Sequence, residues 1–284
     1  MTSIYDLHAH TIHSDGTLTP VELVVRARAN GVGTLALTDH DVTDGVDEAR
    51  AAAHGAGVRL VPGVEISVTW QRQTLHVVGL CIDTAHRPLQ QGLARLREFR
   101  LWRGQEIGRR LQKKNIVGAY ENVRRIARGA VVSRTHFARF LVGRGYVATM
   151  GQAFKQYLAQ GRVAHVPGQW ARLDEALDWI HGAGGIAVLA HPARYGLGAG
   201  KLKRLLQEFH ECGGEAMEVV SGSHGPADVE HMTRLATELG LLGSCGSDYH
   251  GPEKPWIDLG KLPALGPEVA PVWSAFTREY ASPA

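Results

Sequence analysis

The N-terminal stretch Ile4-Tyr5-Asp6-Leu7-His8-Ala9-His10 begins with apolar residues and ends in two histidines. Residues 4–8 are predicted to form a buried strand, and the i, i+2 spacing of His8 and His10 points both side chains in the same direction. Downstream, short apolar runs alternate with amphipathic stretches, which is the pattern of βα units around a parallel sheet. The 284 residues are enough to bury a sizeable core. The stretch therefore predicts the first strand of an α/β domain, with polar side chains gathered at the end of that strand.

Further strands are predicted where a short apolar run is bounded by turn residues. They cover residues 34–38, 58–62, 63–69, 74–82, 185–190, 215–221 and 241–246. Helices are predicted between them, at about residues 20–30, 46–54, 173–182, 201–212 and 227–240. Strands 63–69 and 74–82 are expected to pair with each other. About seven core strands with intervening helices predict a closed or nearly closed βα barrel.

The alternation breaks between Pro88 and about Gly161, where the sequence is almost wholly helical. We therefore predict a barrel made from residues 1–87 and 162–284, with a helical insertion at 88–161. Between Pro88 and Gly145 there are 14 Lys or Arg residues and only three acidic residues. This basic surface is either an ordinary solvated face or a binding surface for a polyanion such as a nucleotide or oligonucleotide.

Composition excludes several classes of protein. The net charge of +3 is too small to identify a partner, and the three cysteines lie too far apart for a disulfide framework. No apolar core of a signal peptide precedes Asp6, and no apolar run reaches the roughly 20 residues needed to cross a bilayer. We therefore expect a cytoplasmic protein with no membrane contact.

Histidine is the one unusual residue, with 15 copies, and its placement indicates a metal site. Histidines scattered on a surface would fall on helices and loops alike. Here potential ligands follow or lie on nearly every predicted strand, where a βα barrel carries its active site. They are His8, His10, Asp15, His40, Glu65, His76, His191, Asp248 and His250.

Several motifs resemble, in order, those of the PHP (polymerase and histidinol phosphatase) family. They are Asp6-Leu7-His8-Ala9-His10-Thr11 with Ser14-Asp15-Gly16, then Thr38-Asp39-His40-Asp41, Gly63-Val64-Glu65-Ile66, Ala190-His191-Pro192 and Gly246-Ser247-Asp248-Tyr249-His250. The resemblance runs from residue 4 to about residue 250, and the motifs are specific as a set. It implies a distorted (β/α)7 barrel that holds up to three divalent metal ions.

The resemblance also implies nine metal ligands in three sites, the first two of which share one glutamate. These are His8, His10, Glu65 and Asp248 in the first site; Glu65, His76 and His136 in the second; and Asp15, His40 and His250 in the third. His136 lies in the helical region, so a partly buried helical histidine is its alternative interpretation. A set of imidazoles and carboxylates without thiolate suits Mn²⁺, Fe²⁺ or Zn²⁺, and Mn²⁺ is our first expectation.

Three residues are expected to act on the substrate. A hydroxide held between two ions that share Glu65 would attack phosphorus, while the cation Arg134 would neutralise the phosphoryl oxygens. His191 is expected to act as a general acid or a phosphate contact, and His224 to line the substrate pocket. The alternatives are one more basic residue of the helical region for Arg134 and a structural histidine for His191.

Three aspartates near the ligands, Asp6, Asp39 and Asp41, are expected to orient the metal-bound histidines.

Within the family, a chain of this size with a helical insertion resembles bacterial members that act on nucleotides and RNA ends. We therefore expect removal of the 3′-phosphate from a nucleoside 3′,5′-bisphosphate. The alternatives are 5′-to-3′ exoribonuclease activity on short RNA and histidinol-phosphate phosphatase activity. An inactive regulatory PHP module is the alternative from a different class. The expected partner is a nucleotide or short oligonucleotide, with no obligate protein partner.

Overall fold

The structure of the chain, a computed structural model, describes residues 3–128, 131–277 and 280, and its strands form one seven-stranded sheet in chain order. The strands are β1 (Ile4–Asp6), β2 (Val32–Leu37), β3 (Arg59–Trp70), β4 (Gln73–Leu80), β5 (Ile186–Leu189), β6 (Ala216–Ser221) and β7 (Leu242–Gly246). The first and last strands close the sheet, because Leu7 N donates to Cys245 O and Asp248 N donates to His8 O, both at 2.9 Å. The predicted barrel is confirmed.

One long strand replaces two that the sequence predicts. Residues 58–62 and 63–69 are not separate strands, because β3 runs through Pro62-Gly63 without a break. The first part of β3 pairs parallel to β2, and from Gly63 onward it pairs antiparallel to β4. Gly63 permits this change of partner, since a Cβ there would lie 2.9 Å from the carbonyl oxygen of Gly79. The predicted pairing of these residues with β4 is confirmed, and it is antiparallel.

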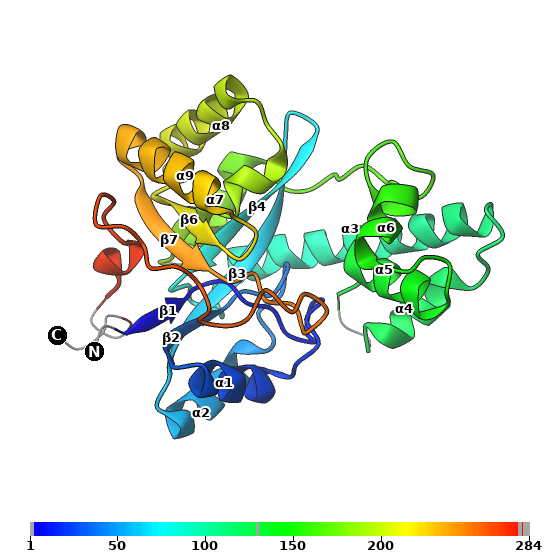
Figure 1. The fold of residues 1–284 in the computed structure, drawn as a ribbon, viewed down its shortest axis with the longest axis horizontal. Helices are drawn as coiled ribbons and strands as arrows, with labels where there is room; N and C mark the ends of the chain where they lie inside the picture. Colours follow the sequence, from blue (N-terminus) through cyan, green and yellow to red (C-terminus); the bar gives the residue numbers. More distant parts are fainter. Residues whose placement is uncertain (1–2, 129–130, 278–279, 281–284) are drawn as a thin grey trace.

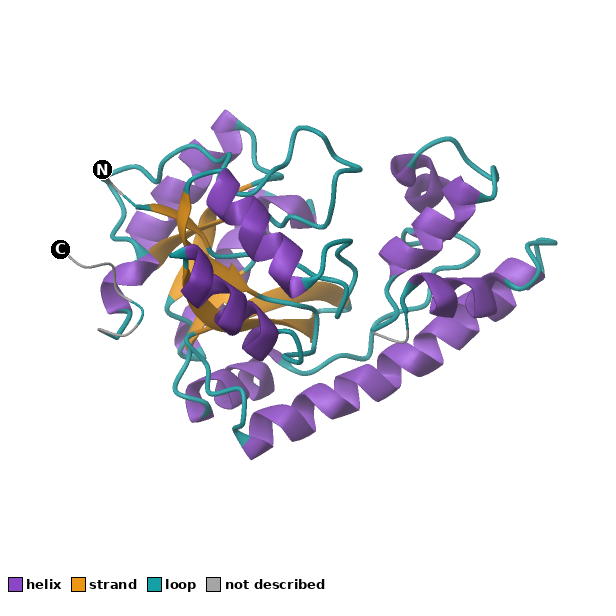
Figure 2. Ribbon diagram, turned by 90° about the horizontal axis from the view of Figure 1, so that it is seen from below, coloured by secondary structure: helices purple, strands orange, loops and turns teal. Residues whose placement is uncertain are grey.

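Helices surround the strands (Figures 1 and 2). The α-helices of the barrel are α1 (Pro20–Ala29), α2 (Val46–Ala56), α7 (Leu173–Gly182), α8 (Ala199–Glu211) and α9 (Pro226–Leu239), with short 3₁₀ turns η2 (Pro192–Tyr195) and η3 (Val272–Ala275). The start of α1 follows from the sequence: the Thr19 side chain accepts from Glu22 N, and the Glu22 carboxylate accepts from Thr19 N at 2.8 Å. No helix in the described part of the chain is both long enough and apolar enough to cross a membrane.

Between β4 and α7 the chain forms a helical segment that extends to one side of the barrel (Figure 1). It consists of α3 (Arg87–Gln112), α4 (Ala119–Ile126), α5 (Arg134–Gly143), α6 (Met150–Ala153) and the π-helical turn η1 (Phe154–Leu158). Figure 2 shows α3 running from the barrel to the far helices. Its N-terminal half packs in the barrel core through Leu89 and Leu93, whereas Ile107 and Leu111 belong to a separate apolar cluster of the segment. The helical segment therefore has a core of its own and is anchored by α3.

Candidate metal centre

The predicted ligands converge at the edge of the barrel where the parallel strands end. His8 and His10 follow β1, His40 follows β2, and Asp248 follows β7, while Glu65 and His76 lie on the paired strands β3 and β4. Glu65 is completely buried, and so are His8 and His10. The structure thus brings together residues that are up to 240 positions apart in the chain (8 to 248).

Glu65 lies between two sets of imidazoles, one at each carboxylate oxygen. Its Oε1 lies near His76 Nδ1 (2.8 Å) and His191 Nε2 (3.2 Å); its Oε2 lies near His40 Nδ1 (2.8 Å), His10 Nε2 (3.3 Å) and His8 Nε2 (3.4 Å). Such separations are those of ligands that share an ion, because two ligand atoms each about 2 Å from one ion lie roughly 3 Å apart. The arrangement suits a carboxylate that bridges two ions.

A further carboxylate group lies on the other side of His40 and His10. Asp15 Oδ1 lies 3.1 Å from His250 Nε2 and 3.7 Å from His40 Nε2. Asp248 Oδ1 lies 3.3 Å from His10 Nε2 and 3.6 Å from His8 Nε2. Among the described residues, three groups of ligand atoms are close enough to hold an ion: His10, Asp15, His40 and His250; His8, His10 and Glu65; and His40, Glu65 and His76.

These donor atoms fit a metal better than they fit one another. In the described part of the chain, buried Asp15 Oδ1, His40 Nδ1, Glu65 Oε2 and His76 Nδ1 have no hydrogen-bond partner. A buried polar atom without a partner costs about 1–3 kcal/mol, and a coordinated cation would remove that cost.

The pKa values of the buried ligands also indicate a site for cations. Burial opposes the charged form of Glu65, yet the imidazoles of His40, His76 and His8 hold the pKa of its carboxyl well below its ordinary value. Burial likewise disfavours a charged His10, but the carboxylates of Asp248 and Glu65, both 3.3 Å from its Nε2, outweigh this effect and raise its pKa to about 10. The site therefore attracts positive charge, which divalent ions would supply.

Three non-glycine residues around the site adopt left-handed backbone conformations. They are Asp41 and Asp248, both with φ of 55°, and His191 with φ of 32°. Each stands just after a strand. Such conformations cost on the order of 1–3 kcal/mol each, so the surrounding fold must hold them in place.

One buried carboxylate at the site was missed from the sequence. Glu218, on β6, lies with Oε1 2.6 Å from His8 Nδ1 and accepts a 2.6 Å hydrogen bond at Oε2 from the backbone N of His191. Gly246 makes room for this pair, since a Cβ there would lie 2.8 Å from Glu218 Oε1 and 2.3 Å from His8 Cβ. The available signal was a single acidic residue between Met217 and Val219 within the strand Ala216–Ser221.

The three aspartates expected to orient histidines form hydrogen bonds with backbone amides around the site. Asp39 accepts from the backbone N of Thr11 at 2.8 Å, Asp41 from Ser67 N at 2.8 Å, and Asp6 from Ser247 N at 2.8 Å. The structure assigns none of them a hydrogen bond with an imidazole among the described residues. They fix the backbones on which the ligands stand.

Two predicted site residues are not brought into the cluster. His136 is buried, but its Nδ1 accepts from the backbone N of Ser133 at 3.2 Å at the start of α5, and it belongs to none of the three ligand groups. His224 Nδ1 faces the carbonyl oxygen of Val219 at 3.1 Å. His191 occupies the position beside Glu65 instead.

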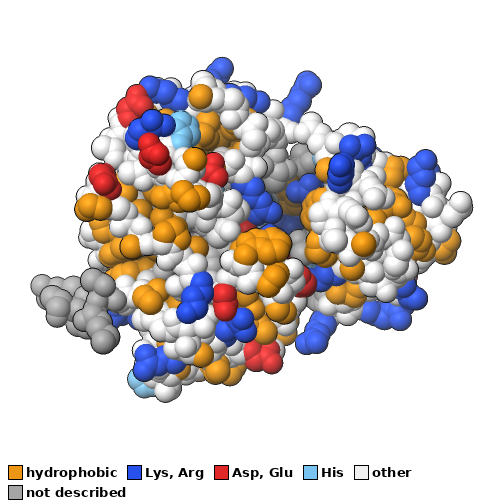
Figure 3. Space-filling view, in the orientation of Figure 1, with side chains coloured by type: hydrophobic (Ala, Val, Ile, Leu, Met, Phe, Trp, Pro, Cys, Tyr) orange, Lys and Arg blue, Asp and Glu red, His pale blue; other side chains and the backbone are white. Residues whose placement is uncertain are grey.

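Beside the ligands lies a small hollow of about 100 Å³, here called the inner hollow. Its lining includes Glu65, His76, His191 and other ligands, and also Arg100, Arg103, Arg134, Arg194, Phe154 and Trp170. Figure 3 shows Lys and Arg side chains gathered where the surface is hollowed between the barrel and the helical segment. Arg134 was predicted here, whereas Arg100, Arg103 and Arg194 were not singled out.

The arginines differ in how they are paired. Arg100 donates to Asp41 Oδ2 at 2.6 Å, and Arg194 donates to Asp248 Oδ2 at 2.8 Å. Arg103 and Arg134 form no ion pair with any carboxylate of the described residues. Burial, then the neighbouring charges of Arg134 and Arg100, lower the pKa of Arg103. An anion in the inner hollow would relieve this repulsion.

A second hollow of about 210 Å³, here called the outer hollow, adjoins the first. The two share Thr135, Phe154, Arg194, Asp248 and His250, and the outer hollow adds Arg139, Met150, Gly151, Gly251, Glu253, Lys254 and Ile257. It is more apolar than the inner hollow and is the larger of the two. His224 lines neither hollow among the residues that the structure describes.

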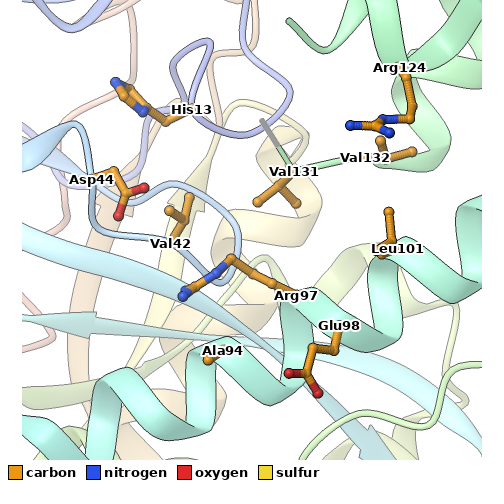
Figure 4. A pocket seen from close by; sticks show the side chains of 10 residues that line it. All are labelled: His13, Val42, Asp44, Ala94, Arg97, Glu98, Leu101, Arg124, Val131 and Val132. Carbon is orange, nitrogen blue, oxygen red and sulfur yellow. The ribbon is translucent and has the colours of Figure 1, made fainter. Parts of the chain in front are cut away.

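A third hollow of about 550 Å³ lies between α3 and the loops after β1 and β2 (Figure 4). Arg97 extends from α3 toward Val42 in it. Its charged lining residues balance, with Asp44 and Glu98 opposing Arg97 and Arg124, and it contains none of the predicted ligands. The ligand cluster therefore remains the candidate site.

Comparison with known proteins agrees with this geometry. The chain is 47% identical to the 5′-3′ exoribonuclease Rnm of Salmonella typhimurium over 281 residues, which cover 98% of this chain and 96% of that relative. It is 44% identical to the 3′,5′-nucleoside bisphosphate phosphatase of Chromobacterium violaceum over 280 residues, 98% of each. A solved structure of an amidohydrolase from Chromobacterium violaceum, with bound sulfate and no metal, matches with a TM-score of 0.91 and 43% identity, over 96% of this chain and 95% of that one.

The sequence pattern of the PHP domain matches residues 6–181, which is more than half of the 284 residues and includes most of the ligand cluster. Together with the barrel and the near full-length relatives, this match shows that the chain belongs to the PHP domain family.

Proposed function

We propose that the chain removes the 3′-phosphate from nucleoside 3′,5′-bisphosphates and releases the nucleoside 5′-monophosphate and inorganic phosphate. It is a hydrolase of phosphoric ester bonds. The observation that carries the choice of substrate is the position of Arg103 and Arg134, two guanidinium groups without a carboxylate partner among the described residues, next to the ligands around Glu65. A substrate with two phosphates can place one at each end of this arrangement.

Three divalent ions would be held by the three ligand groups around Glu65 and Asp15. Mn²⁺ is the metal that we expect. When bound, the ions would lower the pKa of a coordinated water and neutralise the charge of the phosphoryl oxygens. We propose that His191 provides a ligand at Oε1 of Glu65, in the position that the family resemblance gave to His136. This assignment rests on the 3.2 Å between His191 Nε2 and Glu65 Oε1.

The remaining residues bind and orient the substrate. Arg134 lines the inner hollow and directly follows Ser133, whose Oγ donates to Asp15 Oδ2 at 2.7 Å, so we assign Arg134 to the phosphoryl group that reacts. Arg103 lines the same hollow from α3, where its Nε donates to the carbonyl oxygen of Val166 at 3.1 Å, and we assign it to the second phosphate. In the reaction, a water oxygen bonds to phosphorus, the bond from phosphorus to the 3′-oxygen breaks, and that oxygen takes up a proton.

Phosphate release tests the proposal. Adenosine 3′,5′-bisphosphate and a set of sugar monophosphates are compared as substrates in the presence of Mn²⁺. We expect a kcat/KM for the bisphosphate at least about 10-fold above that for any sugar phosphate, because each charged hydrogen bond contributes about 1.5–3 kcal/mol. Equal or faster hydrolysis of the sugar phosphates would refute the assignment.

A second candidate, hydrolysis of 5′-phosphorylated RNA from its 5′ end, is favoured by the outer hollow. That hollow is lined by Asp248 and His250 and also by Arg139, so it offers room for an RNA longer than one nucleotide. Both activities break the same bond beside a second phosphate. Histidinol phosphate is disfavoured because its amine is cationic and the inner hollow is lined by arginines.

An inactive module is disfavoured because eight of the nine predicted ligands converge on one cluster. The proposal requires no protein partner and keeps the expected cytoplasmic location.

A further inference from the structure

We propose that the surface of α5 and α4 beyond the outer hollow binds the RNA backbone on the 3′ side of the bond that is cleaved. This inference rests on the proposed phosphoesterase function and extends it to oligonucleotides. The binding surface is a hollow of about 360 Å³, here called the distal hollow. It is lined by Asn122, Arg125, Ile126, Arg139, Phe140, Gly143 and Arg144.

The distal hollow continues the path that starts at the metal ligands. The outer and distal hollows share Arg139, which lies on α5. Thr135 of the outer hollow, Arg139, and Gly143 of the distal hollow follow one another at i, i+4 spacing, so they lie on one face of the helix. A Cβ at Gly143 would meet no atom of the described residues within 4 Å, so this part of the face is open.

The length of this face exceeds what a mononucleotide needs. From Thr135 to Gly143, α5 rises by about 12 Å, at 1.5 Å per residue. A nucleoside bisphosphate would occupy the inner and outer hollows, with its 3′ side toward the outer one. Only the part of an RNA chain beyond its first nucleotide would reach the distal hollow.

The charge of the distal hollow identifies a polyanion as its occupant. Arg125 Nη2 and Arg144 Nη2 both donate to Asn122 Oδ1, at 3.2 and 3.0 Å, so two cations converge on one neutral oxygen. Neither forms an ion pair with a carboxylate in the part of the chain that the structure describes. Two guanidinium groups held close together without an anion are a phosphate-binding arrangement. An RNA backbone supplies phosphates at regular intervals and would enter from the outer hollow.

The test compares two substrates in a variant with both arginines replaced. The double variant Arg125→Gln/Arg144→Gln is assayed against adenosine 3′,5′-bisphosphate and against a 5′-phosphorylated RNA of ten nucleotides. We expect KM for the RNA to rise about 10-fold or more, and the slope of log KM against log salt to fall by roughly 1.4, at about 0.7 for each phosphate that is no longer neutralised. The kcat/KM for the bisphosphate should change less than about twofold, because this substrate ends before the distal hollow.

The matched control is Lys113→Gln/Lys114→Gln, which removes the same charge from the same helical segment. These two lysines do not line the inner, outer or distal hollow among the described residues. An unchanged KM and salt slope for the RNA in the arginine variant would overturn the proposal. An equal loss for both substrates, or an equal effect of the lysine control, would overturn it as well.

A binding measurement separates this proposal from the proposed function. Fluorescence anisotropy with the labelled ten-nucleotide RNA, in the presence of a chelator, needs no hydrolysis. Weaker binding by the arginine variant alone supports the distal hollow even if the wild-type chain hydrolyses neither substrate, and equal binding by all three proteins refutes it.

Discussion

Arg139, on α5 of the helical segment, donates a hydrogen bond of 2.7 Å from Nη1 to the backbone carbonyl oxygen of Asp15, in the loop after β1. Its Nη2 lies 3.4 Å from the carbonyl oxygen of His250, and its Nε donates to Glu253 at 2.6 Å. The same guanidinium thus joins the two loops that carry Asp15 and His250, both members of one ligand group. The helical segment therefore helps to shape the metal centre as well as the substrate hollows.

Replacing Arg139 should weaken one metal position selectively. In Arg139→Met the loops of Asp15 and His250 lose their common anchor, while the ligands around Glu65 keep theirs. We expect the affinity for one ion to fall about 10- to 100-fold, as when partners that orient metal ligands are removed. Calorimetric titration with Mn²⁺ and elemental analysis after gel filtration measure the change. Arg144→Met, just beyond the end of the same helix, should bind all ions as the wild type does, and full occupancy in Arg139→Met would contradict the prediction.

Replacing the carboxylate of Glu218 should lower metal affinity, although Glu218 is not itself one of the metal ligands. Glu218 Oε1 holds His8 Nδ1, so His8 presents Nε2 to the cluster. In Glu218→Gln the charge that stabilises this orientation is removed, and we expect about 10- to 100-fold weaker binding of the ions nearest His8. Mn²⁺ titration followed by calorimetry measures it. Glu215→Gln is the control, because Glu215 stands just before the same strand and contacts His181 rather than a ligand. If Glu218→Gln binds Mn²⁺ as tightly as the wild type does, the contact between Glu218 and His8 does not support metal binding.

Most of the barrel was predictable because its signals are local. His8, His10 and His40 stand at the ends of apolar runs, and strand periodicity alone places them at one edge of a sheet. The division of β3 at Pro62 was wrong because Pro and Gly indicate a turn in isolation. Here the parallel partner β2 is exchanged for the antiparallel partner β4 at this point, and a change of partner leaves no local signal.

The residues that the sequence did not single out depend on contacts between distant positions. Glu218 and His8 are 210 positions apart, and no spacing rule connects them. Arg103 was one of many basic residues in the helical region, and only the fold shows that it faces the ligands without a carboxylate partner among the described residues. Sequence alone could not test whether His136 is a ligand, because that depends on contacts between distant positions. In the structure His136 contacts the backbone of Ser133, and His191 lies beside Glu65.

Removing metal should reduce stability as well as activity. Without cations the buried carboxylates of Glu65, Asp15 and Asp248 are balanced mainly by imidazoles. An ion that binds only the folded chain adds about 2.7 kcal/mol at a concentration 100 times its Kd. We expect Tm to fall when a chelator is added and to rise with the logarithm of Mn²⁺ concentration. A Tm that does not depend on Mn²⁺ would contradict binding of Mn²⁺ by the folded cluster.

Replacing Arg103 should reduce the preference of the enzyme for a substrate that carries a second phosphate. Arg103 faces the inner hollow without a carboxylate partner among the described residues, and we assign it to the phosphate that does not react. In Arg103→Gln the removal of a charged hydrogen bond, about 1.5–3 kcal/mol, should lower kcat/KM for adenosine 3′,5′-bisphosphate about 10- to 100-fold. Adenosine 3′-monophosphate has no second phosphate, so its kcat/KM should stay within about threefold.

Two further variants make this comparison specific. Arg103 also donates to the carbonyl oxygen of Val166 at 3.1 Å and lies over the Trp170 ring, so a general disturbance of the hollow must be distinguished from the removal of a phosphate ligand. Arg103→Lys keeps the charge and should recover part of the bisphosphate activity, whereas Arg109→Gln, on an exposed part of the same helix, should leave both substrates unaffected. If both substrates lose activity equally in Arg103→Gln, the residue supports the fold of the hollow and does not bind the second phosphate.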